Sequence, residues 1–68
     1  MNSEVTRCLL DACDDPHIDI KISAAYALGE SGKPTTEVLR KLLDLSHNPY
    51  NEVKIVALKA LGRIHRNK

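Results

Sequence analysis

The chain has 68 residues, 43% of them hydrophobic and 28% charged, a composition typical of a globular protein and not of a disordered one. A chain this short buries too little surface to be very stable alone, so we expect a single domain over residues 1–68 that gains stability from a partner. Ten Lys and Arg against nine Asp and Glu leave a net charge of +1, which argues against binding nucleic acid or a membrane surface through bulk charge.

The location of the protein is predicted from its start and its uncharged stretches. The longest uncharged stretch, Ile22–Gly29, is far shorter than the ~20 residues that span a bilayer. The first residues lack the basic-then-apolar order of a signal peptide. We therefore expect a cytoplasmic protein without membrane contact. Cys8 and Cys13 agree with this as free thiols, because residues five apart on a helix point about 140° away from each other.

The sequence contains an internal duplication. When the chain is shifted by 33 positions, 13 of the 26 pairs between residues 4–29 and 37–62 are identical, without a gap. This period predicts two copies of one supersecondary element, a first repeat over about 3–32 and a second over about 36–66. The first-repeat members of the identical pairs are Glu4, Val5, Arg7, Leu9, Leu10, Asp11, Pro16, Lys21, Ile22, Ala24, Ala27, Leu28 and Gly29.

Each repeat begins with a predicted amphipathic helix, over about Ser3–Cys13 in the first and Thr36–Ser46 in the second. In the first helix, one buried stripe is expected from the spacing of Val5, Cys8, Leu9 and Ala12. The corresponding apolar residues of the second repeat are Val38, Leu39, Leu42, Leu43 and Leu45. We interpret the charged positions as a solvated face with ion pairs inside each helix, namely Glu4, Arg7 and Asp11, and then Glu37, Arg40 and Asp44.

The second helix of each repeat follows an Asx-Pro pair. An Asx side chain can cap a helix and Pro fits its first position, so we expect helices over about Pro16–Ser31 and Pro49–Arg66. Gly32 and Pro34 predict the end of the first of these, and Thr35 or Thr36 should cap the helix that follows. Because all connections are short, neighbouring helices should be antiparallel.

These second helices are apolar on more than one side. In the second repeat, Ile55 and Leu58 form a stripe beside the main one, and Ile22 and Ala25 are their counterparts in the first. A helix with two apolar faces packs against its own partner helix and against a neighbouring repeat. Gly29 and Gly62 lie within the helical pattern, where we expect them to let helix axes approach closely. The main stripe of the second repeat is Val53, Val56, Ala57, Ala60, Leu61 and Ile64.

Residues 15–29 resemble a known repeat signature. They read DPHIDIKISAAYALG, which is similar to the D-P-x-x-x-V-R-x-x-A-A-x-A-L-G signature of HEAT repeats of the phycobilisome-lyase type. The second repeat matches with Asn48 for Asp and Leu58 for the second Ala, and both repeats have Lys for Arg. The resemblance implies an all-α fold, an α–α superhelix (solenoid) of two helix-turn-helix repeats with four antiparallel helices. It also implies a ladder between repeats, which here would use Asp19, Glu52, Lys21 and Lys54.

No set of residues has the spacing of a catalytic, cofactor or metal site. Cys8, Cys13 and His17 could be considered as metal ligands, but the helix break at Asp15-Pro16 separates His17 from the two cysteines. The nearest nucleophile and base, Cys13 and His17, have no oxyanion-stabilising context. We therefore predict that the protein is not an enzyme and uses no cofactor or metal. The acidic cluster lacks the order of a calcium loop and is interpreted as capping and solvation, and its members are Asp11, Asp14, Asp15 and Asp19.

Charge is separated along the chain. Residues 1–20 carry five acids and one base, a net charge of −4, whereas residues 50–68 carry five bases and one acid, a net charge of +4. Cations near the end of the last helix suit its dipole, which accounts for part of this asymmetry. The remainder favours attraction between the ends of two chains, or between the basic end and an acidic partner or nucleic acid.

These observations predict a non-enzymatic protein–protein interaction or scaffold module. A solenoid generally needs about three repeats and polar caps, so we expect a homo-oligomer, formed by stacking or by helix exchange through Lys33-Pro34. Three alternatives stay open: nucleic-acid contact through the basic last helix, an accessory role in a phycobilin lyase-like process suggested by the resemblance alone, and a place in a longer solenoid. The candidate binding residues are Ile55 and Leu58, where a third repeat would pack, and the cations Lys54, Lys59, Arg63 and Arg66.

Overall fold

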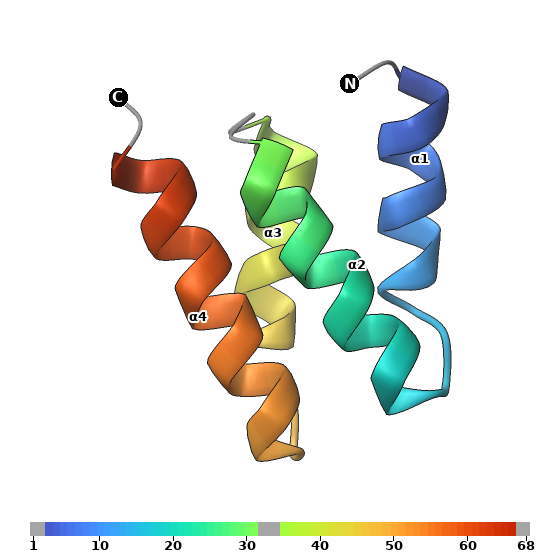
Figure 1. Ribbon diagram of the computed structural model, residues 1–68, viewed down its shortest axis with the longest axis vertical. Coiled ribbons are helices and arrows are strands. Elements are labelled where there is room, and N and C mark those ends of the chain that lie inside the picture. The colour runs from blue at the N-terminus through green and yellow to red at the C-terminus, as the bar shows by residue number, and fades with distance from the viewer. Residues whose placement is uncertain (1–2, 32–34, 67–68) are drawn as a thin grey trace.

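The computed structural model describes residues 3–31 and 35–66, which form four α-helices and no strand (Figure 1). This confirms the all-α prediction. The chain turns at the bottom of Figure 1 between α1 and α2 and again between α3 and α4, which gives two helical hairpins. Within the described ranges no helix combines the length and the apolar character needed to cross a membrane. The helices are α1 (Ser3–Ala12), α2 (Ile18–Ser31), α3 (Thr36–Leu45) and α4 (Asn51–Arg66).

The helices that follow the two Asx-Pro pairs begin later than the sequence predicts. Asp15 Oδ1 accepts the backbone N–H of His17 at 2.9 Å, and Asn48 Oδ1 accepts that of Tyr50 at 2.9 Å. Each Asx residue thus closes a turn across its proline. The carbonyl of His17 then accepts the first helical bond, from Lys21. The prolines therefore lie in turns, and α2 and α4 begin two residues after them.

The start of α3 agrees with the predicted cap. Thr35 has an extended backbone, with φ −69° and ψ 154°, and its hydroxyl accepts the backbone N–H of Val38 at 3.2 Å. This bond satisfies one of the N–H groups that a helix start leaves without an intrahelical partner. Gly32, Lys33 and Pro34, which the sequence assigns to a helix stop and to the linker for helix exchange, lie outside the described residues.

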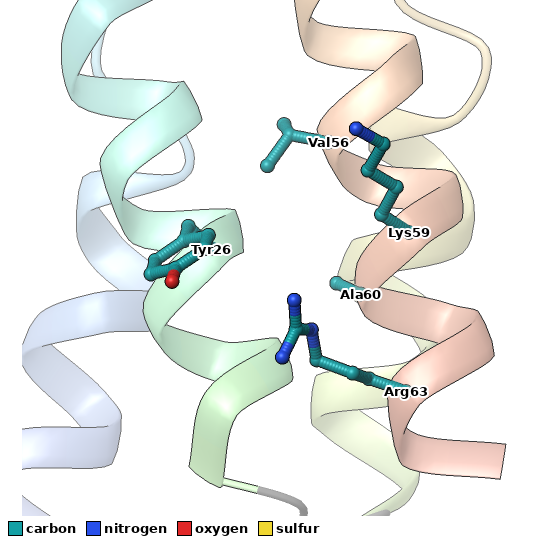
Figure 2. Close-up of a pocket in the computed structure, with 5 residues that line it drawn as sticks. All are labelled: Tyr26, Val56, Lys59, Ala60 and Arg63. Carbon is teal, nitrogen blue, oxygen red and sulfur yellow. The ribbon is translucent and has the colours of Figure 1, made fainter. Parts of the chain in front are cut away.

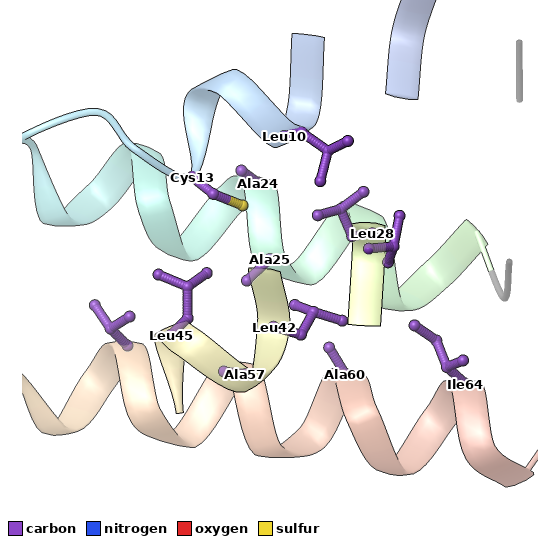
Figure 3. Packing of buried hydrophobic residues seen from close by; sticks show 12 residues of the cluster. Leu10, Cys13, Ala24, Ala25, Leu28, Leu42, Leu45, Ala57, Ala60 and Ile64 are labelled. Atoms are coloured by element: carbon purple, nitrogen blue, oxygen red, sulfur yellow. The ribbon is translucent and has the colours of Figure 1, made fainter. Parts of the chain in front are cut away.

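The core lies between the two hairpins and is built on the close approach of α2 and α4. In Figure 3, Leu10 and Cys13 reach the cluster from α1 and the turn after it, while Ala57, Ala60 and Ile64 point into it from α4. The other fully buried members are Ala24, Ala25, Leu28, Val38, Leu42, Leu45 and Val53. No polar or charged residue of the described part is fully buried.

The two glycines have different surroundings. A Cβ atom built on Gly29 would lie 2.7 Å from the Cβ of Ala60 and 2.8 Å from its Cα. Gly29 therefore sets the distance between α2 and α4, as the sequence predicts. A Cβ atom on Gly62 would meet nothing within 4 Å, so no packing among the described residues explains that glycine.

The stripe predicted for the first helix is wrong in part. Leu10 and Cys13 are fully buried, whereas Val5 and Cys8 are exposed and Leu9 and Ala12 are only partly covered. The physical reason is that α1 has a neighbouring hairpin on one side alone. In α3 the predicted Val38, Leu42 and Leu45 are buried, but Leu43 is exposed.

Ion pairs join the two hairpins. Arg7 lies 4.0 Å from Asp11 in its own helix, at the limit of an ion pair, but only 2.7 Å from Glu37 of α3. Lys41 of α3 donates to both oxygens of Asp14 at 2.8 and 3.0 Å. Such exposed pairs add little stability, so their main effect is to fix how the hairpins are aligned.

Candidate functional site

The predicted binding residues Ile55 and Leu58 lie on the exposed side of α4. They are 52% and 58% exposed, respectively. At 3.6 residues per turn, Gly62 falls between them on the helix surface, and the fully buried Ala57 and Ile64 lie on the other side. We call this surface the trailing face and define it as Leu43, Ile55, Leu58, Leu61 and Gly62.

The trailing face is the exposed copy of a surface that is covered in the first repeat. Leu10 is 3% exposed, but Leu43, 33 positions later, is 53% exposed. Ala25 is completely buried, whereas its counterpart Leu58 is largely exposed. The second hairpin covers the first-repeat positions, whereas Leu43 and Leu58 are left exposed by the residues that the structure describes.

The opposite end of the molecule shows the reverse relation. Val53 is completely buried in the second repeat, and its counterpart Ile20 is 41% exposed. Val38 is buried and its counterpart Val5 is exposed. We call this second surface the leading face and define it as Val5, Ala12, Ile20 and Ala27, whose counterparts are Val38, Leu45, Val53 and Ala60.

The predicted cations flank the trailing face instead of forming one basic surface. Lys54 is half-buried on one side of the apolar stripe of α4. Lys59 and Arg63 are four residues apart and lie on its other side. The side chain of Arg66 lies outside the described residues. The Lys21 ammonium, assigned by the resemblance to an inter-repeat ladder, is 3.4 Å from the carbonyl of Cys13.

A shallow hollow of about 210 Å³ lies between α2 and α4 (Figure 2). The guanidinium of Arg63 lies 2.8 Å from Glu30 and 5.8 Å from the centre of the Tyr26 ring, so it bridges the two repeats. Sequence reasoning did not single out Tyr26 or Glu30. A signal was present, since Glu30 and Arg63 occupy equivalent positions with opposite charges. The hollow is lined by Tyr26, Val56, Lys59, Ala60 and Arg63.

The residues with reactive side chains have different surroundings. Both cysteines are free thiols, and burial raises the pKa of Cys13 to about 11. His17 Nδ1 lies 2.9 Å from Asp15 Oδ1 at the start of α2, on an exposed turn. Across the described part of the chain, no group of three or more His, Cys, Asp or Glu is placed to hold a metal ion.

Comparisons with protein-family models, with curated proteins and with solved structures found no match.

Proposed function

We propose that this chain is a non-enzymatic protein–protein interaction module and that the trailing face is its binding surface. The observation that carries the proposal is the exposure of Leu43, Ile55 and Leu58 at positions whose first-repeat counterparts are covered. Full burial of one such side chain contributes about 1.5–3 kcal/mol. Covering all three is therefore comparable to the stability of a small domain, on the order of 5 kcal/mol.

The proposed architecture is an α–α superhelix of two HEAT-like repeats with antiparallel neighbours. Three observations support it: the 33-residue period, the D-P to A-L-G segment of residues 15–29, and the two hairpins whose longer helices α2 and α4 pack together. In such an array each repeat contacts only its neighbours, so an end repeat leaves one apolar face uncovered.

The absence of catalysis is part of the proposal and is supported by the state of Cys13. A thiol must form the thiolate to act as a nucleophile, and burial in an apolar core opposes that. Cys13 is completely buried and its pKa is raised to about 11, so it acts as a core residue.

An affinity experiment with matched variants tests the proposal. Immobilised wild-type chain should retain protein, including free copies of itself, from an extract of the source cell. Leu58→Glu should lose it, because a charge would be buried in the contact. Tyr50→Glu is the control, since Tyr50 is 53% exposed and its counterpart His17 stays exposed in the covered repeat. Equal retention by wild type and Leu58→Glu would refute the proposed surface.

Nucleic-acid contact through α4 is less well supported. One of its four cations, Arg63, is already paired with Glu30. Binding of DNA or RNA at low salt that survives Leu58→Glu and is lost in Lys59→Glu would favour this alternative.

A further inference from the structure

We infer that the trailing face binds the leading face of a second copy of this chain, so that copies stack head to tail as the two repeats stack within one chain. This inference rests on the proposed function, because it names the partner of the same surface. The internal contact between the repeats provides the template. Leu10 and Ala25 are buried, and their counterparts Leu43 and Leu58 are exposed at one end of the molecule. Val38 and Val53 are buried, and their counterparts Val5 and Ile20 are exposed at the other end.

Gly62 gives the most specific support. Glycine is the poorest helix former after proline, and a Cβ atom built on Gly62 would have no neighbour within 4 Å among the described residues that would require a glycine. In the internal contact, Gly29 is required by Ala60, which leaves no room for a Cβ atom. A shift of 33 positions converts that pair into Gly62 and Ala27. Stacking a second copy in the same register would therefore place Ala27 against Gly62 and explain the glycine.

The two faces are also compatible in volume. On the trailing face, Leu58 is larger than its buried counterpart Ala25. On the leading face, Ala12 is smaller than its buried counterpart Leu45, so the two differences in volume are equal and opposite. Packed apolar side chains tolerate substitutions best when their total volume is conserved. The internal packing can thus be repeated between copies without overfilling.

Charge favours the same orientation. The Arg7–Glu37 pair, 2.7 Å long within the chain, maps onto Arg40 of one copy and Glu4 of the next. The Glu30–Arg63 pair maps onto Arg63 and Glu30 of the next copy, which extends a line of alternating charges. The third pair, Asp14–Lys41, maps onto His47 and Cys8, so its acid–base pairing is not repeated between copies. Among the described side chains, residues 3–20 carry a net charge of −4 and residues 50–65 one of +2, and these opposite charges add attraction over a longer range.

Stacking of unlike faces has a distinctive consequence. Each copy offers one leading and one trailing face, and the contact is heterologous, so bound copies still expose one free face of each kind. The mass of the assembly should therefore rise continuously with concentration instead of stopping at a dimer. A contact between two identical faces would stop at two copies.

Light scattering and sedimentation on the full chain and two complementary variants test the inference. Leu58→Glu blocks the trailing face and Ile20→Glu blocks the leading face, so each should be monomeric alone. Mixed in equal amounts, they should form a 1:1 dimer and nothing larger. The intact leading face of Leu58→Glu can bind the intact trailing face of Ile20→Glu, and no second pair of intact faces is left. Assembly of either variant alone, or no dimer in the mixture although both give the circular dichroism of folded helices, would overturn the inference.

Gly62→Ala provides a test that does not depend on introducing a charge. The added methyl has free space in the isolated chain but would meet Ala27 of the stacked copy. The variant should remain folded and should lose at least tenfold in association. Undiminished association would overturn the inference. A wild-type chain that stays monomeric at high micromolar concentration would overturn the inference. If that wild-type chain still retains another protein in the affinity experiment and Leu58→Glu does not, the proposed function is left standing.

Discussion

At the scale of single residues, the two cysteines have opposite environments. Cys8 is exposed, while Cys13 is buried and its pKa is raised to about 11 by that burial. Because alkylating reagents react with the thiolate, we expect iodoacetamide near neutral pH to modify Cys8 and to spare Cys13. Mass spectrometry should show one adduct on the native chain and two after unfolding in denaturant. Equal rates of modification at the two thiols in the native state would contradict this assignment.

Of the two Asx residues that close the turns before α2 and α4, only Asp15 is expected to make stability depend on pH. The backbone N–H and the ring of His17 bond to Asp15 and lower its pKa. A carboxyl with a lower pKa in the folded than in the unfolded state adds stability above its unfolded pKa, about 4. That stability is lost as pH falls through the folded pKa. Asn48 makes the same turn with a neutral oxygen, 2.9 Å from the N–H of Tyr50.

Asp15→Asn should therefore keep the turn and remove part of the acid sensitivity. Thermal unfolding followed by circular dichroism should show a helix content like that of wild type at neutral pH and a smaller fall in Tm below about pH 4. Asp15→Ala is the contrast, because it loses the acceptor and should unfold at lower temperature throughout. If Asp15→Asn loses Tm on acidification as steeply as wild type, titration of Asp15 is not the cause.

At the scale of elements, the contact between α2 and α4 depends on Gly29. A Cβ atom there would lie 2.8 Å from the Cα of Ala60, a backbone atom that cannot move aside easily. Overfilling a packed site costs about 1–3 kcal/mol, more than the ~1 kcal/mol that alanine gains over glycine in a helix. We expect Gly29→Ala to lower the free energy of unfolding by on the order of 1 kcal/mol, measured by urea denaturation. A gain in stability would show that the helices can separate at little cost.

Sequence periodicity predicts where the helices lie better than it predicts which other helices pack against them. The four helices follow from spacing within each segment, and the structure confirms them. The second apolar stripe of Ile55 and Leu58 also follows from spacing, and both side chains are exposed in the structure. The burial of α1 could not be predicted in this way. Val5 and Val38 are identical and equivalent, but only Val38 has a hairpin beside it. A local pattern gives the apolar side of a helix and not whether another element covers that side.

The candidate site shows the same limit. The sequence identifies Arg7 as a member of an ion pair but places its partner in the same helix, whereas the 2.7 Å contact is with Glu37 of the other hairpin. It also assigns one packing role to Gly29 and Gly62, which have different surroundings. In both cases the missing information is the order of the repeats in space. The repeat itself supplies that order once equivalent positions are compared for burial.

At the scale of the whole molecule, stability and association should be coupled. Association involves the folded chain alone, so the Tm of wild type should rise with protein concentration. Gly62→Ala gains about 1 kcal/mol of helix propensity, which corresponds to about 4–8 °C in Tm for a domain of this size. In dilute solution the variant should therefore unfold at a higher temperature than wild type.

The difference should shrink as the solutions are concentrated, because the Tm of wild type climbs while that of Gly62→Ala stays nearly constant. Scanning calorimetry from low micromolar to near-millimolar chain measures both trends, and Leu58→Glu supplies a second variant whose Tm should not depend on concentration. A parallel rise in wild type and Gly62→Ala would mean that copies associate without contact at Gly62. The order of Tm values in dilute solution separately reports the cost of glycine in α4, since no partner is bound there.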